Sequence, residues 1–427
     1  MVALAVASIA STIGSAQVEY DFLLKGGHVI DARNEISAVR DVAIKDGRIA
    51  AVARDIPASR ALKAVDVSGL YVTPGLIDIH VHVYPGEVTN SFARGNWSVY
   101  PDGYTLENCV TTVSDAGSAG WRNFEDFKSR IVDQSRTRVT SFLNIVGHGM
   151  GSGATEQNLD DMDVKRTAEM ALKHKGVIVG IKSAHFAGPE WTPYERSVEV
   201  GRIASIPVMV DFGSNVRAGR TLDDLLNKYF RPGDIYTHMY GGSRGEQDPE
   251  TKGPSQAMID GRKRGVFFDV GHGAASFRWT AAVPMVKEGF GPDSISTDLH
   301  VRSMTAAMKN MLNVMGKFLA MGMPLDDVIR RATWNPAKQI QLEQLGNLSV
   351  GSPGDVAVLR LEKGRFGFVD PVGRMDAGQR LACEMTLRDG KVVYDLNGMI
   401  KDAWDTVAPG STGGDPRWDA TTPRPPR

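Results

Sequence analysis

Two histidines spaced two residues apart offer the clearest chemistry in this sequence. His80 and His82 lie in the apolar run 75–82, which reads Gly-Leu-Ile-Asp-Ile-His-Val-His. Because side chains alternate along a β-strand, both imidazoles would point to the same side of it. Two imidazoles on one face can bind one divalent metal ion. A half-buried strand with two hydrogen-bonded histidines is the alternative, and the run alone leaves both interpretations open.

Turn-forming residues bound this run on both sides. Pro74-Gly75 stand at its start, and Tyr84-Pro85-Gly86 follow it. The two histidines are therefore expected at the C-terminal end of a short buried strand. Barrel enzymes hold their catalytic residues at this end of their strands.

Seven further apolar runs alternate with helical stretches along the middle of the chain. They cover residues 111–115, 141–146, 177–182, 207–211, 234–238, 265–270 and 294–298. With the run 75–82 they make eight predicted strands. Strands that alternate with helices predict an α/β protein with a parallel sheet, and eight such units predict a (β/α)8 TIM-like barrel.

The ends of these strands would bring several titratable residues into one pocket. In chain order the candidates are His80, His82, Lys182, Asp211, His238, His272 and Asp298, with His185 close behind Lys182. Four of the nine histidines of the chain lie at these positions. This concentration favours a shared metal site over separate structural roles.

Lys182 and Asp298 each have a chemical role and a simpler alternative. A lysine ammonium buried beside metal ligands is costly, and carbamylation would turn Lys182 into an anionic ligand that bridges two metal ions. The alternative is a surface lysine with a buried stem. Asp298 could act as a general acid/base on water beside a metal ion. Its alternative is the N-cap of the helical stretch that starts near residue 302.

Both ends of the chain read as short β runs separated by turns. Gly26-Gly27 and Asp46-Gly47 are typical of hairpin turns. We expect residues 18–73 and 345–403 to form one small β-sandwich domain, with the barrel at 74–344. Residues 404–427 are rich in proline, glycine and charge, which predicts a disordered tail.

Composition limits the partners and the location. The chain has 427 residues with a net charge of −1 and no basic block, so no nucleic-acid partner and no membrane association are expected. Residues 1–17 are uncharged and end near Gly14-Ser15-Ala16, which is typical of a signal peptide, although a basic n-region is missing. This favours a periplasmic or secreted protein, and a cytoplasmic one otherwise.

The chain has two cysteines, Cys109 and Cys383, far apart in the sequence. Two cysteines exclude a zinc site built from cysteine ligands alone. No disulfide between them is predicted.

These motifs together resemble a known group of metal-dependent hydrolases. The run 75–82, Lys182, His238 and Asp298, in this order between two halves of a small β domain, resemble the amidohydrolase superfamily over residues 18–400. Thr111-Thr-Val-Ser-Asp-Ala-Gly, Phe268-Asp-Val-Gly-His-Gly and Ser296-Thr-Asp-Leu-His are similar to its deacetylase-like branch, also called dihydroorotase-like or D-aminoacylase-like.

The resemblance implies two divalent metal ions, with zinc the expected element, and a role for each candidate. His80 and His82 would bind the more buried ion with Asp298. An N6-carboxylated Lys182 would bridge both ions, and His238 would bind the more exposed one. The resemblance also implies that His272 contacts the substrate or its developing oxyanion, and we expect His185 to approach the substrate as well. A homo-oligomer is a further expectation from the family.

The fifth strand departs from the family pattern. The ligand there is commonly a histidine, whereas this chain has Asp211. Aspartate can bind zinc through oxygen, but its negative charge would weaken the Lewis acidity of the exposed ion. We expect Asp211 to be a ligand, and the occupancy of the second metal site stays open.

The expected reaction is hydrolysis of a small linear amide or ester by a metal-bound hydroxide, with Asp298 as general acid/base. N-acyl amino acids, peptide-like amides and acylated hydroxy acids are the expected substrates. A cyclic amidohydrolase that opens a hydantoin- or dihydropyrimidine-like ring is the alternative, and a non-catalytic barrel scaffold is a remote one. Tyr84 stands where dihydroorotases carry a carboxylate-binding arginine, which argues against that activity. Five arginines in loops after the strands could bind a carboxylate, namely Arg94, Arg217, Arg244, Arg278 and Arg302.

Overall fold

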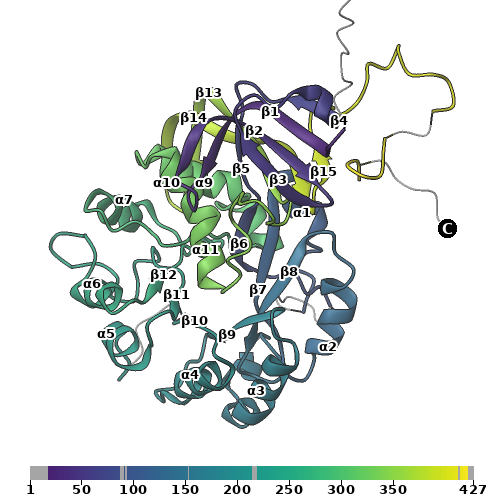
Figure 1. Ribbon diagram of the computed structural model, residues 1–427. Helices are drawn as coiled ribbons and strands as arrows, with labels where there is room; N and C mark the ends of the chain where they lie inside the picture. The colour runs from purple at the N-terminus through teal and green to yellow at the C-terminus, as the bar shows by residue number, and fades with distance from the viewer. Residues whose placement is uncertain are drawn as a thin grey trace, which may run out of the picture.

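The chain folds into a barrel and a small β domain (Figure 1). A computed structural model describes residues 18–86, 91, 94–151, 153–213, 219–411 and 414–421. The predicted signal peptide at 1–17 lies outside the described residues.

Seven parallel strands form the curled sheet of the barrel and follow one another in chain order. They are β6 (Leu76–Val81), β7 (Val110–Gly120), β8 (Arg138–Asn144), β9 (Ile178–Ala184), β10 (Val208–Asp211), β11 (Ile235–Tyr236) and β12 (Phe267–Phe268). All residues of β6, β7, β9 and β10 are buried, as expected of strands that are covered on both faces. The predicted TIM-like barrel is confirmed.

The eighth predicted strand, 294–298, is not a regular strand. It closes the barrel between β12 and β6 through isolated bridges from Ser294 to Asp269 and from Leu299 to Val81. The backbone of Asp298 has a left-handed φ of 53°, which interrupts a β ladder.

The helices α2 to α7 lie outside the barrel strands (Figure 1). The helices are α1 (Asp102–Thr105), α2 (Phe124–Phe127), α3 (Val164–Lys173), α4 (Thr192–Ala204), α5 (Leu222–Asp224), α6 (Gln256–Lys263), α7 (Trp279–Lys287), α8 (Val301–Thr305), α9 (Met311–Ala320), α10 (Leu325–Ala332) and α11 (Trp334–Gln339). The buried residues of α10 form one apolar face, because Ala332 follows Val328 by four residues and Ile329 by three.

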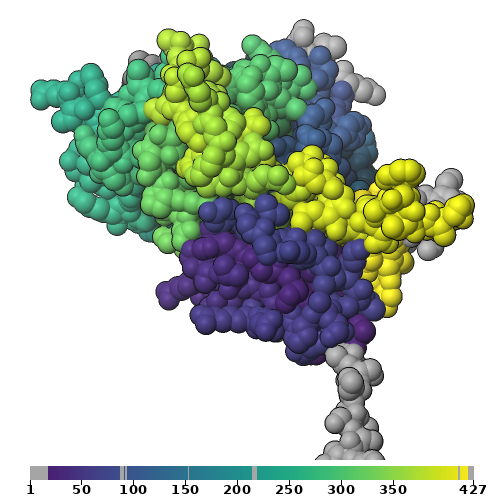
Figure 2. Space-filling model, turned by 90° about the horizontal axis from the view of Figure 1, so that it is seen from above, coloured from purple at the N-terminus to yellow at the C-terminus, as the bar shows by residue number. Residues whose placement is uncertain are grey.

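The small domain is built from both ends of the chain, which lie together in one lobe (Figure 2). Its strands are β1 (Tyr20–Asp31), β2 (Ile36–Lys45), β3 (Arg48–Ala53), β4 (Ala61–Asp66), β5 (Tyr71–Pro74), β13 (Val356–Val369), β14 (Arg374–Arg388) and β15 (Lys391–Asp395). They form one mostly antiparallel sheet in the order β15-β14-β13-β5-β1-β2-β3, with β4 paired to β1. Because β5 pairs with both β1 and β13, it joins the N-terminal and C-terminal halves.

One of the two predicted hairpin turns lies inside a strand. Asp46-Gly47 connect β2 to β3, as predicted. Gly26-Gly27 instead form a bulge within β1, where the register with β2 shifts between Leu24 and Gly27. Gly26 has a φ of +75°, which glycine adopts without strain, so the pair adds a residue to the strand and does not reverse it.

The two cysteines form a disulfide, contrary to the sequence expectation. Cys109 and Cys383 are 274 residues apart in sequence, and their Cα atoms are 5.6 Å apart. Cys109 directly precedes β7 in the barrel, and Cys383 belongs to β14 of the small domain. The separation in sequence does not predict whether the two cysteines pair, because packing of the barrel against the small domain brings the start of β7 next to β14.

The predicted disordered tail is partly ordered. Trp418 is buried and its ring lies 6.1 Å from that of Phe22 in β1. Val392 of β15 exchanges backbone hydrogen bonds with Trp418 and Ala420. Packing of the Trp418 side chain thus holds residues 414–421 against the small domain. The polar composition of the segment does not predict this contact.

No helix in the described part of the chain is long and apolar enough to span a lipid bilayer.

Candidate metal centre

A cavity of about 230 Å³ opens at the C-terminal end of the barrel strands. Its lining residues are His80, His82, Met150, Lys182, His185, Asp211, His238, Ala274, Ala275, Ser276, Asp298, His300 and Arg302. All predicted site residues except His272 are among them. The convergence of strand ends that the sequence analysis assumes therefore occurs.

Abrupt turns after the strands direct several of these side chains into the cavity. His185, His238 and Asp298 have φ values of 56°, 63° and 53°, in the left-handed region. Residues without a glycine's freedom rarely adopt this conformation, and it is concentrated at functional sites. His185 follows β9 by one residue and His238 follows β11 by two, whereas Asp298 lies within the barrel-closing segment.

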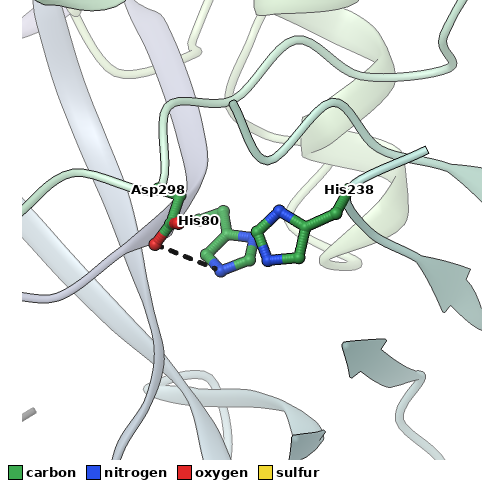
Figure 3. A group of neighbouring side chains, drawn as sticks. All are labelled: His80, His238 and Asp298. Atoms are coloured by element: carbon green, nitrogen blue, oxygen red, sulfur yellow. Dashed lines mark ion pairs between the residues drawn. The ribbon is translucent and has the colours of Figure 1, made fainter. Parts of the chain in front are cut away.

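Three side chains form the tightest group of possible metal ligands. One donor atom each from His80, His238 and Asp298 lie within 4.8 Å of one another (Figure 3). Oδ1 of Asp298 lies 3.7 Å from Nε2 of His80 and 3.1 Å from Nε2 of His82. The three residues come from β6, the end of β11 and the closing segment.

Hydrogen bonds on the far side of the rings decide which nitrogen faces the cavity. Nδ1 of His238 is bonded to the carbonyl oxygen of Gly271, which accepts only. Nδ1 of His80 lies 2.9 Å from the hydroxyl of Thr237, and that hydroxyl donates to Asp269. In both rings Nδ1 therefore carries a hydrogen and Nε2 is the atom left to face the cavity, as in histidines that bind metal.

Protonation states support the same conclusion. Burial, together with the nearby Lys182, lowers the pKa of His80 to about 3, so its imidazole is neutral. Burial alone would raise the pKa of Asp298, but the hydrogen bond from His82 and the neighbouring imidazoles hold it well below its usual value. Neutral imidazole and ionised carboxylate are the forms that bind a divalent cation, so the residues present fit such an ion.

Lys182 is fully buried, which rules out the surface-lysine alternative. Its Nζ lies 3.2 Å from Nε2 of His80 and 3.6 Å from Sδ of Met209. No carboxylate of the described residues forms an ion pair with it. Burial lowers its pKa, which favours the neutral amine over the ammonium.

Asp211 lies between two histidines on the other side of the cavity. Its Oδ2 is 2.8 Å from Nε2 of His185 and 3.2 Å from Nε2 of His238. Nδ1 of His185 is 2.8 Å from Glu156. Although burial opposes it, the carboxylates of Asp211 and Glu156 raise the pKa of His185 to about 10. His185 is therefore placed at the cavity wall as a cation between two carboxylates.

His272 does not reach the cavity, contrary to the expectation of a substrate contact. It is fully buried, and its ring stacks on Phe277 with centroids 4.8 Å apart. The glycines on both sides, Gly271 and Gly273, have positive φ and form a turn. The backbone of this turn faces the metal centre, so the side chain between them points away from it.

Asp298 is not a helix N-cap. The N-cap of α8 is His300, whose ring accepts a hydrogen bond from the backbone of Ser303. This removes the structural alternative for Asp298.

The residues that support the candidate ligands from behind were not among those predicted from the sequence. Asp269 accepts hydrogen bonds from the hydroxyls of Thr237, Ser294 and Ser296. Asp78 accepts from Thr297, and burial raises its pKa to about 7. The available signal was a lone aspartate inside an otherwise apolar strand run, which occurs at both positions.

Of the five candidate arginines, Arg302 is the one described residue that lines the cavity. Its guanidinium lies 4.8 Å above the ring of Trp97. Arg244 is buried and donates to the carbonyl of Gly213. Arg94 and Arg278 do not line the cavity, and Arg217 lies outside the described residues.

Tyr84 also points elsewhere. Its hydroxyl donates to Asp126 at 2.5 Å, and it is not part of the cavity wall.

Comparison with known proteins gives matches over most of the chain. Residues 275–395 match the profile of the Amidohydrolase family. A deacetylase from Brucella anthropi is 32% identical over 352 residues, which are 81% of this chain and 85% of the relative. A crystal structure of an adenine deaminase superposes with a TM-score of 0.81 at 28% identity, covering 88% of this chain and 100% of the other. A crystal structure of a dihydroorotase gives a TM-score of 0.75 at 28% identity, covering 88% and 99%.

Proposed function

This chain belongs to the amidohydrolase family of hydrolytic enzymes, and we propose that it is a metal-dependent hydrolase of linear amides or esters that carry a carboxylate. The observation that carries the proposal is the convergence of His80, His238 and Asp298 within 4.8 Å. His80 and His238 present Nε2 to the cavity, and Asp298 is an ionised carboxylate. Such a donor set binds zinc and similar divalent ions.

Two ions would share the ligands of the cavity. His80, His82 and Asp298 would hold one ion, and His238 with Asp211 would hold the other. Lys182, carboxylated at Nζ, would bridge them. Its lowered pKa supports this assignment, because the neutral amine is the form that reacts with carbon dioxide.

Divalent metal ions in such a site lower the pKa of water and polarise a carbonyl oxygen. Asp298 is ionised and buried at the edge of the cavity. Its Oδ1 faces Nε2 of His82, and its other oxygen, Oδ2, would take the proton of the attacking water. Asp298 then gives this proton to the leaving amine or alkoxide, as a general base that becomes a general acid.

Arg302 would bind the carboxylate of the substrate. Its planar guanidinium can form two parallel hydrogen bonds to a carboxylate. Packing over Trp97 holds it at the cavity, and none of the described carboxylates pairs with it. N-acyl amino acids and acylated hydroxy acids both offer such a group.

The deacetylase relative supports a linear substrate, and the dihydroorotase neighbour supports the alternative of ring opening. Two observations favour the linear substrate. The deacetylase match spans 81% of this chain at 32% identity, and Tyr84 occupies the position of the expected arginine while pointing to Asp126.

The buried disulfide between Cys109 and Cys383 supports a location in an oxidising compartment. We therefore propose that the enzyme works in the periplasm or outside the cell.

The test uses protein expressed with bicarbonate and zinc. Elemental analysis is expected to find about two metal ions per chain, as in other two-metal hydrolases. The protein should then hydrolyse members of a panel of N-acetyl amino acids and O-acetyl hydroxy acids. Hydrolysis of hydantoin or dihydropyrimidine in preference to every linear member would overturn the proposal in favour of the cyclic alternative. Absence of bound metal would contradict the metal centre itself.

A further inference from the structure

A second lysine is buried outside the cavity, in α9. Lys317 has no exposed surface, and three atoms surround its Nζ. They are Nε2 of His272 at 2.5 Å, the carbonyl oxygen of Ala307 at 3.0 Å and that of Val369 at 2.6 Å. The partners come from the segment after β12, the segment after α8 and the end of β13. One side chain therefore joins the barrel to the small domain.

The hydrogen bonds around Lys317 require three hydrogens on its nitrogen. Nδ1 of His272 lies 2.8 Å from the carbonyl oxygen of Gly273, so Nδ1 carries the hydrogen of the ring. Nε2 then has a lone pair and accepts. Since the other two partners are carbonyls, all three accept, and only the ammonium form of Lys317 satisfies them.

The surroundings hold this ammonium weakly. Burial lowers the pKa of Lys317 to about 7, the carboxylate of Asp370 raises it and the nearby Lys309 lowers it. Besides His272, the rings of Phe277 and Trp279 face the ammonium, with centroids at 5.0 and 5.6 Å.

The turn that carries His272 is in close contact with the candidate ligands. A Cβ on Gly271 would lie 2.9 Å from Nδ1 of His238 and 3.0 Å from Nδ1 of His80. A Cβ on Gly273 would lie 2.5 Å from Oδ2 of Asp298. The carbonyl oxygen of Gly271 also accepts the hydrogen bond that orients His238. Small shifts of this turn would therefore move three ligands at once.

We propose that Lys317 is a positioning residue, whose ammonium, acting through His272, fixes the turn 271–273 behind the metal centre. His272 is the one side chain of this turn, and both of its nitrogens are bonded. Loss of the Lys317 hydrogen bond frees the ring of His272 and, with it, the backbone that orients His238. The inference rests on the proposed metal centre and assigns a function to a buried cation outside the ligand set.

Two variants test the proposal, with a third as control. Lys317→Met keeps the length of the side chain and removes its hydrogens. His272→Phe keeps the stacking on Phe277 and removes both nitrogens. Lys309→Met removes a nearby charge with no contact to the turn. Zinc affinity, measured by competition with a chelator, is the first readout, and the pH dependence of kcat/KM is the second.

Each of the first two variants should weaken zinc binding about 10- to 100-fold, as expected for a partner that orients a ligand. The double variant should bind zinc as tightly as the single variant with the lower zinc affinity, because both residues act through one contact. The pH profile of Lys317→Met should lose a step near neutral pH that the wild type and Lys309→Met retain. Wild-type zinc affinity with an unchanged pH profile in Lys317→Met would overturn the proposal, as would additive losses in the double variant.

A rescue experiment covers the case in which Lys317→Met folds poorly. Lys317→Ala should regain zinc affinity in ethylammonium and not in ethanol. Equal recovery in both would show that only volume matters, and this would also overturn the proposal. If the wild type itself binds no zinc, the proposed function fails, which is a result distinct from these.

Discussion

Nε2 of His238 lies 3.2 Å from Oδ2 of Asp211, and both residues line the same cavity. The ring hydrogen of His238 is on Nδ1, bonded to the carbonyl oxygen of Gly271. Two ligands of one tetrahedral zinc ion lie about 3.3 Å apart, so this separation fits a shared metal ion.

Asp211→His should strengthen binding of the second metal ion about tenfold, because an imidazole nitrogen is a better donor to zinc than a carboxylate oxygen. Metal content during stepwise titration with a chelator measures this. Glu156→Gln is the matched control, since it removes the other carboxylate beside His185 and leaves Asp211 in place. Unchanged stoichiometry and affinity in Asp211→His would show that Asp211 is not a ligand.

Asp298→Asn should keep much of the bound metal while kcat falls about 10²- to 10⁴-fold, the usual effect of losing a general acid/base. The amide retains an oxygen for the metal but cannot take a proton.

His80→Ala should lose metal and activity together. Elemental analysis alongside turnover separates the two variants, and near-normal turnover in Asp298→Asn would refute its proposed role.

Arg302→Gln should raise KM for carboxylate substrates about 10- to 100-fold, the loss expected for one charge-assisted hydrogen-bonded pair. An N-acetyl amino acid and its neutral carboxamide form the matched substrate pair. The wild type should prefer the acid, and the variant should treat both alike with its metal content unchanged. If the preference persists in the variant, another group binds the carboxylate.

Replacement of Cys109 and Cys383 together by serine should lower the free energy of unfolding by about 2–5 kcal/mol, because the disulfide closes a long loop between the two domains. Urea unfolding with and without reductant measures this. Reductant should destabilise the wild type and leave the double variant unaffected. Equal unfolding curves for the reduced and oxidised wild type would contradict the role of the disulfide.

Lys317 should make stability depend on pH. Its pKa is about 7 in the folded chain and about 10.4 when unfolded, so the folded state binds fewer protons between these values. The cost of burying the charge is fully present below pH 7 and is relieved as pH rises toward 10. Relative to Lys317→Met, the free energy of unfolding of the wild type should therefore rise by at most about 1.4 kcal/mol per pH unit in this window. Parallel pH profiles of the two proteins, from chemical unfolding between pH 6 and 10, would rule this out.

The sequence alone determined the barrel and most of the residues that line its cavity. Short apolar runs that alternate with helices specify parallel strands, and parallel strands of a barrel place their C-terminal ends together. His80, Lys182 and His238 could therefore be assigned to one site from their positions in the runs. Asp211 could be assigned to the same site, because it stands at the end of the apolar run 207–211.

Only the tertiary structure decided the contacts that depend on packing between distant segments. The pairing of Cys109 with Cys383, the return of Trp418 to the small domain and the choice of Arg302 all follow from surfaces that meet in space. The direction of His272 depends on the backbone of two flanking glycines, whose conformation residue type does not specify. Strand alternation fixes which way a side chain points, but at a turn or between domains the local sequence leaves that direction free.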